Sequence, residues 1–422
     1  MGFFSNRTTG HLKLPILRPA GAGILVLCLA VVSVCGVGPA FGDASEEERG
    51  SGGSDDVLDL AFRFASRIPA DPHVADRSKA QYNALSAVLE AGRLEEAKRK
   101  AGRILNWRRG VVYAEIAGRH LAVGETEQAE RYLNFARQFR DRVEGFNSGW
   151  QKERITAAIG EAYADAGRFD EADRLVADLS PEAKSGVRMA RLTAVDTLEA
   201  YRESMAVLEK MEASKFWEVQ KAVAEAYIEI LRTLGDAADE QQATAVRQGV
   251  YRLTKKLPVL QKCPLHVSLA RAAFETGHER IGFDVLNETR SDFEGADLNA
   301  RFDVGQLVLL AKAYQEVAGR PEVAAALLEQ AAALLAGSDL LRPDEVRTNR
   351  ELGSGYAVHG DTENAWRWYR NAINAAAGQV NGRPRFVMFS EICVSIAEAG
   401  LALSEDSASL LLKQLNRRVL SW

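Results

Sequence analysis

The pattern of apolar and polar residues predicts a series of short amphipathic helices. From about Val57 onward, apolar residues recur at spacings of three and four, with small residues where neighbouring helices would touch. A β-rich fold would need longer runs rich in Val, Ile and Thr with strict alternation, and the sequence has none longer than a few residues. We therefore expect an all-α fold.

Two segments, residues 158–179 and 351–373, show the repeating unit most clearly. Each carries a small residue, an aromatic residue, a glycine, an alanine and a bulky residue at the same spacing. In the first segment these are Gly160, Tyr163, Gly167, Ala172 and Val176, and in the second they are Gly353, Tyr356, Gly360, Ala365 and Tyr369. The small residues allow two helices to approach closely, and the glycine ends the first helix in a left-handed turn. The spacing therefore predicts a helix–turn–helix unit.

This unit resembles the tetratricopeptide repeat family, a helical hairpin of about 34 residues. The same register places the small residue at Leu85, Ala117, Gly160, Ala194, Ala224, Ala270, Ala311, Gly353 and Cys393. It places the turn glycine at Gly92, Gly124, Gly167, Gly277, Gly360 and Gly400, with Gly319 and Gly235 slightly displaced. The resemblance implies an α-solenoid of about nine antiparallel hairpins over residues 57–422, wound as a right-handed superhelix, with a capping helix at about 405–422.

The first residues carry the pattern of an export signal. Residues 1–42 hold three bases and no acid, an apolar core from Ile24 to Val34, and small residues at Ala40 and Gly42, which indicates a secretory signal peptide. The alternative is an uncleaved membrane anchor at residues 20–38, because the apolar core alone is shorter than the roughly 20 residues of a spanning helix. Residues 43–56 are acidic and rich in Gly and Ser, which predicts a disordered linker. We expect an exported protein of the periplasm or the extracellular space.

Charge and cysteine content exclude several classes of protein. Without residues 1–42 the chain holds 50 bases and 58 acids, a net charge of −8, which opposes binding to a nucleic-acid backbone. Only Cys263 and Cys393 remain, about three units apart, so we expect no disulfide between them. All prolines after the leader are expected at helix starts or between hairpins.

The sequence offers no convergent catalytic chemistry. The Cys263-Pro-Leu-His266 segment has a metal-like spacing but no second pair of ligands, so we interpret it as a loop cysteine and a histidine at a helix start. A phosphate-binding glycine loop and a nucleophile elbow are both missing from the sequence. We expect no catalytic residues, no metal and no cofactor.

The remaining candidate is a charged groove along the first helix of each hairpin, which binds peptides or partner proteins in the family that the sequence resembles. Carried onto this register, the basic groove residues are Arg154, Arg188, Arg191, Arg271, Lys312, Arg347 and Arg350. A parallel acidic line, two residues before the turn glycine, consists of Glu90, Asp165, Glu199, Glu229, Glu275, Glu316 and Glu398. Opposed basic and acidic lines suit a dipolar or extended charged peptide. The alternative is a solvated helix surface on which Arg271–Glu275 and Lys312–Glu316 are ion pairs within one helix.

These observations favour a non-catalytic scaffold or adaptor that binds a protein or peptide in a bacterial-type cell envelope. The partner would be neither a nucleic acid nor a small-molecule cofactor, and the membrane would be contacted only through an N-terminal anchor. The alternatives are an enzyme whose carboxylates converge inside the superhelix and, more remotely, a repeat protein that binds RNA.

Overall fold

The computed structural model describes residues 56–145, 148–195, 197–214, 217–255, 257–294 and 297–417. The predicted signal peptide and nearly all of the predicted linker, residues 43–55, lie outside these residues. The described part is all-helical, as the sequence predicts, and contains these helices: α1 (Val57–Ser66), α2 (Ala70–Glu90), α3 (Leu94–Ala101), α4 (Arg108–Ala122), α5 (Thr126–Arg142), α6 (Ser148–Asp165), α7 (Phe169–Val176), α8 (Pro181–Thr193), α9 (Leu198–Met211), α10 (Trp217–Leu234), η1 (Gly235–Ala237), α11 (Glu240–Thr254), α12 (Val259–Glu275), α13 (Glu279–Ser291), α14 (Ala300–Glu316), α15 (Pro321–Ala336), α16 (Arg342–His359), α17 (Thr362–Ala377), α18 (Gly382–Glu398) and α19 (Glu405–Asn416).

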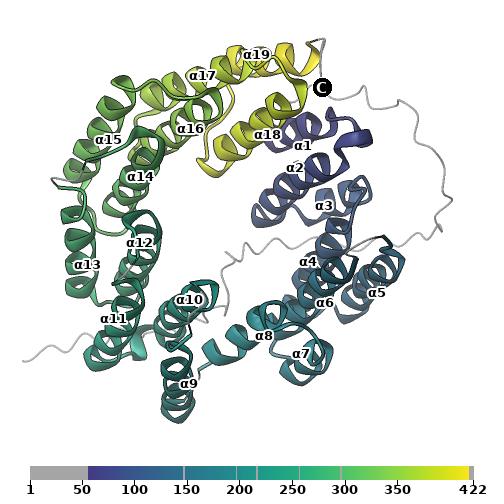
Figure 1. Cartoon of the computed structure of the whole chain (residues 1–422), viewed down its shortest axis with the longest axis vertical. Helices are drawn as coiled ribbons and strands as arrows, with labels where there is room; N and C mark the ends of the chain where they lie inside the picture. Colours follow the sequence, from purple (N-terminus) through teal and green to yellow (C-terminus); the bar gives the residue numbers. More distant parts are fainter. Residues whose placement is uncertain are drawn as a thin grey trace, which may run out of the picture. The chain divides into compact units, whose positions relative to one another are not determined.

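The even-numbered helices of the described chain form a closed succession. Each one from α2 to α16 contacts the next even-numbered helix, and α18 contacts α2 in turn. We call this succession the inner ring. In Figure 1 the odd-numbered helices α5, α7, α9, α11, α13, α15 and α17 lie outside it. Each packs on the inner helix that precedes it in the sequence, except α9, which packs on the inner helix that follows it, α10.

The predicted repeat register is reproduced at the turns. All eight glycines that the register assigns to turns have a positive φ, at Gly92, Gly124, Gly167, Gly235, Gly277, Gly319, Gly360 and Gly400. The aromatic residue of the unit ties one hairpin to the preceding one, because its hydroxyl reaches the preceding outer helix or its end. These hydrogen bonds are Tyr163 to Glu130 (2.9 Å), Tyr227 to Glu212 (2.7 Å) and Tyr314 to Asn287 (2.8 Å). Spacing in the sequence thus fixes contacts between successive hairpins.

Helix α1 closes the ring by completing the last hairpin. Helix α18 packs extensively on α1 and only marginally on α19, although α19 follows it in the sequence. Phe64 of α1 is fully buried, and its ring lies 4.9 Å from that of Phe389 and 6.1 Å from that of Phe386, both in α18. An ion pair of 2.9 Å between Asp76 of α2 and Arg383 of α18 crosses the same junction. We call the junction of α1, α2 and α18 the seam.

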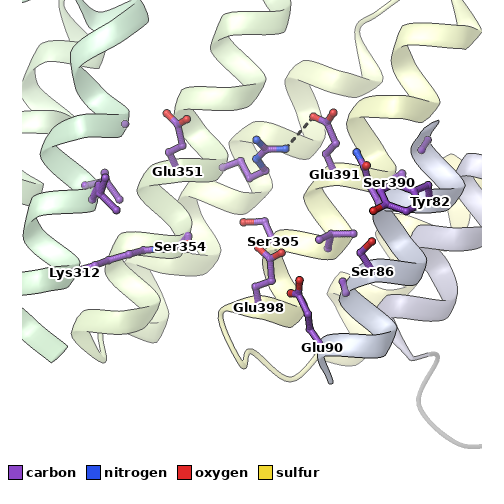
Figure 2. A pocket seen from close by; sticks show the side chains of 18 residues that line it. Tyr82, Ser86, Glu90, Lys312, Glu351, Ser354, Ser390, Glu391, Ser395 and Glu398 are labelled. Carbon is purple, nitrogen blue, oxygen red and sulfur yellow. Dashed lines mark hydrogen bonds and ion pairs between the residues drawn. The ribbon is translucent and has the colours of Figure 1, made fainter. Parts of the chain in front are cut away.

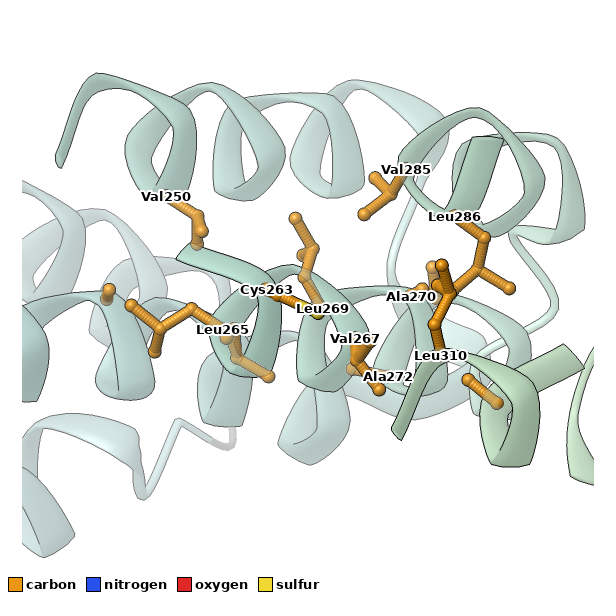
Figure 3. Close-up of a cluster of buried hydrophobic side chains, with 14 of the residues drawn as sticks. Val250, Cys263, Leu265, Val267, Leu269, Ala270, Ala272, Val285, Leu286 and Leu310 are labelled. Atoms are coloured by element: carbon orange, nitrogen blue, oxygen red, sulfur yellow. The ribbon is translucent and has the colours of Figure 1, made fainter. Parts of the chain in front are cut away.

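Local expectations from the sequence are wrong at two places in the chain, the end of α8 and the first half of α12. Ala194 is exposed at the C-cap of α8, so the turn of the fourth hairpin comes earlier than the register predicts. Pro264 lies in the second turn of α12, and not between hairpins, because α12 begins at Val259. Cys263 therefore sits within a helix, in the buried cluster of Figure 3, and tertiary packing outweighs the hydrogen bond that proline removes.

Candidate functional site

A cavity of about 610 Å³ lies against four helices of the inner ring, α2, α14, α16 and α18 (Figure 2). Helices α2 and α18 come from opposite ends of the described chain, so the cavity exists only because the ring closes. Its volume is in the range of sites for small ligands or short peptide segments. The lining residues are Ala80, Tyr82, Asn83, Ser86, Ala87, Glu90, Gly305, Val308, Leu309, Lys312, Arg350, Glu351, Ser354, Ser390, Glu391, Val394, Ser395 and Glu398.

Helical periodicity explains why these side chains line the cavity. On α18 the lining residues recur one turn apart, at Ser390 and Glu391, at Val394 and Ser395, and at Glu398. Residues three and four apart lie on one face of a helix, and the opposite face enters the core. The residue that follows the small position of the repeat lines the cavity in four units, at Ser86, Lys312, Ser354 and Val394. That position is the signal in the sequence from which Ser86 and Ser354 could have been found.

The predicted basic and acidic lines are paired across neighbouring helices. Arg271 of α12 contacts Glu316 of α14, and Glu275 of α12 lies 3.1 Å from Arg232 of α10. The pairs within one helix that the alternative reading expects, Arg271–Glu275 and Lys312–Glu316, are not among the ion pairs of the described residues. Much of the predicted groove is therefore neutralised by its own charges, and it holds adjacent inner helices together.

Of the predicted lines, Lys312 and Arg350 on the basic side and Glu90 and Glu398 on the acidic side line the cavity. Lys312 donates a hydrogen bond to the Ser354 hydroxyl. Arg350 forms an ion pair of 2.9 Å with Glu391 across α16 and α18.

The other basic residues of the prediction are directed elsewhere. Arg191 contacts Asp173 on the outer helix α7, and so it is directed away from the neighbouring inner helices. Arg347 lies 3.1 Å from Asp344 of its own helix, and Arg154 and Arg188 are exposed. The register placed these side chains on inner helices correctly, but helix rotation in the ring determines which of them reach the cavity.

Three charged side chains at the cavity have no ion-pair partner among the described residues: Lys312, Glu90 and Glu398. Burial lowers the pKa of Lys312, with the nearby carboxylates opposing that effect. Burial, followed by repulsion from Glu90, raises the pKa of Glu398, against the smaller influence of Arg350 and Lys312. Burial likewise raises the pKa of Glu351. The cavity thus presents a free cation on α14 and free carboxylates on α2 and α18.

A second group of acids, which the sequence analysis missed, lies on the neighbouring inner helices. The Tyr82 hydroxyl donates to Glu115 of α4 at 2.6 Å, and burial raises the pKa of the Glu115 carboxyl. Burial, followed by repulsion from Asp165, raises the pKa of Glu161 on α6 to about 7. Glu161 is exposed as a whole residue, but its carboxylate lies so close to Gly186 of α8 that a Cβ there would collide with it. Like Lys312, Glu161 follows the small residue of its unit.

The metal-like Cys263–His266 spacing has a structural role. His266 is 1% exposed and lies between the hydroxyls of Thr254 (2.9 Å) and Thr289 (3.2 Å), stacked on the Tyr251 ring. Burial lowers the pKa of His266 to about 4 and raises that of the Cys263 thiol to about 12. Both Cys263 and Cys393 are buried free thiols. His266 is therefore a neutral core residue in the middle of α12, and not a residue at a helix start.

Within the described residues no group of His, Cys, Asp and Glu side chains could hold a metal ion. None of the described helices combines the length and the apolar character needed to cross a bilayer. No known family model, curated protein or solved structure matches the chain.

Proposed function

We propose that this chain is a non-catalytic scaffold that binds peptide segments of a partner protein in the cavity of its inner ring. The observation that carries the proposal is the combination of unpaired charges of both signs, Lys312 facing Glu90 and Glu398, in one cavity of about 610 Å³. Lys312 is partly buried, whereas Glu90 and Glu398 are exposed to solvent, so all three can be reached by a ligand. A ligand that pairs with them forms charge-assisted hydrogen bonds, which are stronger than those between neutral groups. An extended peptide carries charges of both signs along its length.

The architecture supports membership in a group of tetratricopeptide-like solenoids. The positive φ of all eight assigned turn glycines and the burial of the small residues, with Ala194 as the exception, agree with that unit. The closed contact between α18 and α2 distinguishes this array from an open superhelix. The proposal includes export to the cell envelope or the extracellular space, which rests on the composition of residues 1–42 alone.

Affinity selection from a randomised pentapeptide library, with retained peptides identified by mass spectrometry, tests the proposal. The chain is expected to retain a defined subset of peptides, and Lys312→Met is expected to weaken binding of the acidic ones about tenfold. Lys221→Met is the matched control, because Lys221 is an exposed inner-ring lysine on α10, outside the cavity. Failure of the unaltered chain to retain any peptide would contradict the proposal.

The second candidate is an enzyme, favoured by the pKa of about 7 at Glu161 next to Asp165. A carboxyl group that titrates near neutral pH is suited to general acid–base catalysis. Screening the chain against glycoside and peptide substrates tests this candidate. Turnover that is lost in Glu161→Gln, with peptide binding unchanged, would establish it over the scaffold.

A further inference from the structure

The two free carboxylates of the cavity meet at the seam. Glu90 is the last residue of α2 and Glu398 is the last residue of α18, and Figure 2 shows their side chains next to each other. Neither carboxylate has an ion-pair partner among the described residues, whereas the neighbouring Glu391 is neutralised by Arg350. Two like charges therefore face each other where the ends of the array join.

The ends of the two helices add to this negative potential. The C-terminus of a helix carries a partial negative charge from its free carbonyl groups, and a basic residue in the last turn commonly offsets it. Neither α2 nor α18 has a basic residue in its last turn. Lys312 and Arg350 lie near enough to lower the pKa of Glu398, but burial and Glu90 outweigh them. The seam end of the cavity is thus a place where a cation is stabilised.

A buried hydroxyl marks the other end of the cavity. Ser390 is 2% exposed, lines the cavity, and forms no hydrogen bond with any described residue. It precedes Glu398 by eight residues on α18, which corresponds to roughly 12 Å along a helix. An extended peptide covers about 3.3 Å per residue, so about four residues would reach from Glu398 to Ser390.

We propose that the cavity holds the free N-terminus of a peptide, with its ammonium group between Glu90 and Glu398 and its next residues extended along α18 towards Ser390. This inference rests on the proposed peptide-binding function. An ammonium group has three donors and a single positive charge, which suit two carboxylates, whereas Mg²⁺ and Ca²⁺ take about six or more oxygen ligands. Lys312, on the opposite wall, pairs with an acidic side chain among the first residues of the peptide.

The test compares two randomised pentapeptide libraries, one with free N-termini and one N-acetylated, by affinity selection and mass spectrometry. The chain is expected to retain peptides of the free library only. The affinity of the best retained peptide, measured by calorimetry, is expected to fall about tenfold or more when its N-terminus is acetylated. Acetylation removes the positive charge of the N-terminus and with it a charge-assisted hydrogen bond.

The double variant Glu90→Gln/Glu398→Gln is expected to bind the free and the acetylated peptide equally and weakly. The variant should fold, since it removes a repulsion, and circular dichroism checks this. Glu275→Gln, an inner-ring carboxylate outside the cavity, should keep the preference for the free peptide. Equal retention of both libraries by the unaltered chain would overturn the ammonium site and leave peptide binding intact. Retention of neither library would overturn both proposals.

Discussion

At the scale of single residues, the position after the small residue of each unit determines the chemistry of the inner ring. It contributes Ser86, Lys312 and Ser354 to the cavity and Glu161 to the neighbouring acidic group. The small residue holds the helix close to its neighbour, so the next residue is rotated towards the inside of the ring. A change at this position therefore alters charge at the inner surface without removing core volume.

Glu161→Gln is expected to change how the stability of the fold depends on pH. The pKa of Glu161 is about 7 in the folded chain, above its ordinary value of 4.5, so between these pH values the folded state binds more protons than the unfolded state. The free energy of unfolding of the unaltered chain therefore falls as pH rises from about 4.5 to 7. Asp165 and Glu115 strengthen this effect, and Arg154 weakens it.

Urea unfolding at pH 4.5 and pH 8 measures this effect. Relative to the unaltered chain, Glu161→Gln should be more stable at pH 8 and of similar stability at pH 4.5. Glu225→Gln is the control, because Glu225 also follows the small residue of its unit but lies 3.3 Å from Lys221. If both variants follow the pH dependence of the unaltered chain, Glu161 ionises at its ordinary pKa.

At the scale of helices, α1 is a detached part of the last hairpin. It supplies the apolar surface on which α18 packs, although more than 300 residues of sequence separate the two helices. The Asp76–Arg383 ion pair connects the same two ends of the chain, and its residues lie 307 positions apart in the sequence. The hairpins between these ends hold together through contacts between sequence neighbours. The seam is therefore the one junction of the inner ring that no connecting loop holds together.

Phe64→Ala is expected to lower the free energy of unfolding by about 3–5 kcal/mol, the usual cost of removing a fully buried aromatic ring. The ring of Phe64 has no exposed surface and contacts α18 at the seam. Denaturant unfolding measures the change. Phe302→Ala, at a ring that is 44% exposed, should cost about 0.5 kcal/mol. Equal costs for the two variants would show that α1 does not hold the seam.

The repeat could be predicted from the sequence because its causes are local. The glycines at the turns, the tyrosines between hairpins and the burial of Cys393 follow from spacing within about 40 residues. The register failed at Ala194, where the turn arrives early, and at Pro264, which a weak local preference placed outside a helix. The periodicity of a short segment does not indicate how that segment packs on segments that are distant in the sequence.

The candidate site was predicted less well, for the same reason. Lys312 and Arg350 belong to the predicted basic line, and Glu90 and Glu398 belong to the predicted acidic line. That Glu90 and Glu398 meet follows only from the contact between α2 and α18, which no repeat pattern indicates. Arg191 fails because its partner, Asp173, lies on an outer helix. The rotation of each helix about its axis depends on the whole ring, so a one-dimensional register assigns side chains to a helix but not to the cavity.

At the scale of the whole ring, we expect the fold to survive circular permutation. Helix α19, which ends at Asn416, contacts α1, so a Gly/Ser linker from residue 417 to residue 57 joins helices that already touch. New ends opened at residues 338–340, in the loop between α15 and α16, interrupt no helix. Circular dichroism and cooperative urea unfolding should match those of the unaltered chain. A permutant opened in the middle of α16 should not fold, and equal behaviour of the two permutants would argue against this expectation.

Closure also constrains how such a chain can evolve. An open array of hairpins can gain or lose a unit, since each unit contacts only its neighbours. In the inner ring the rotations contributed by successive hairpins must add up to one full turn, or α1 will not meet α18. A duplicated or deleted hairpin would leave a gap or an overlap at the seam, whereas substitutions of side chains and changes of loop length would leave the closure intact.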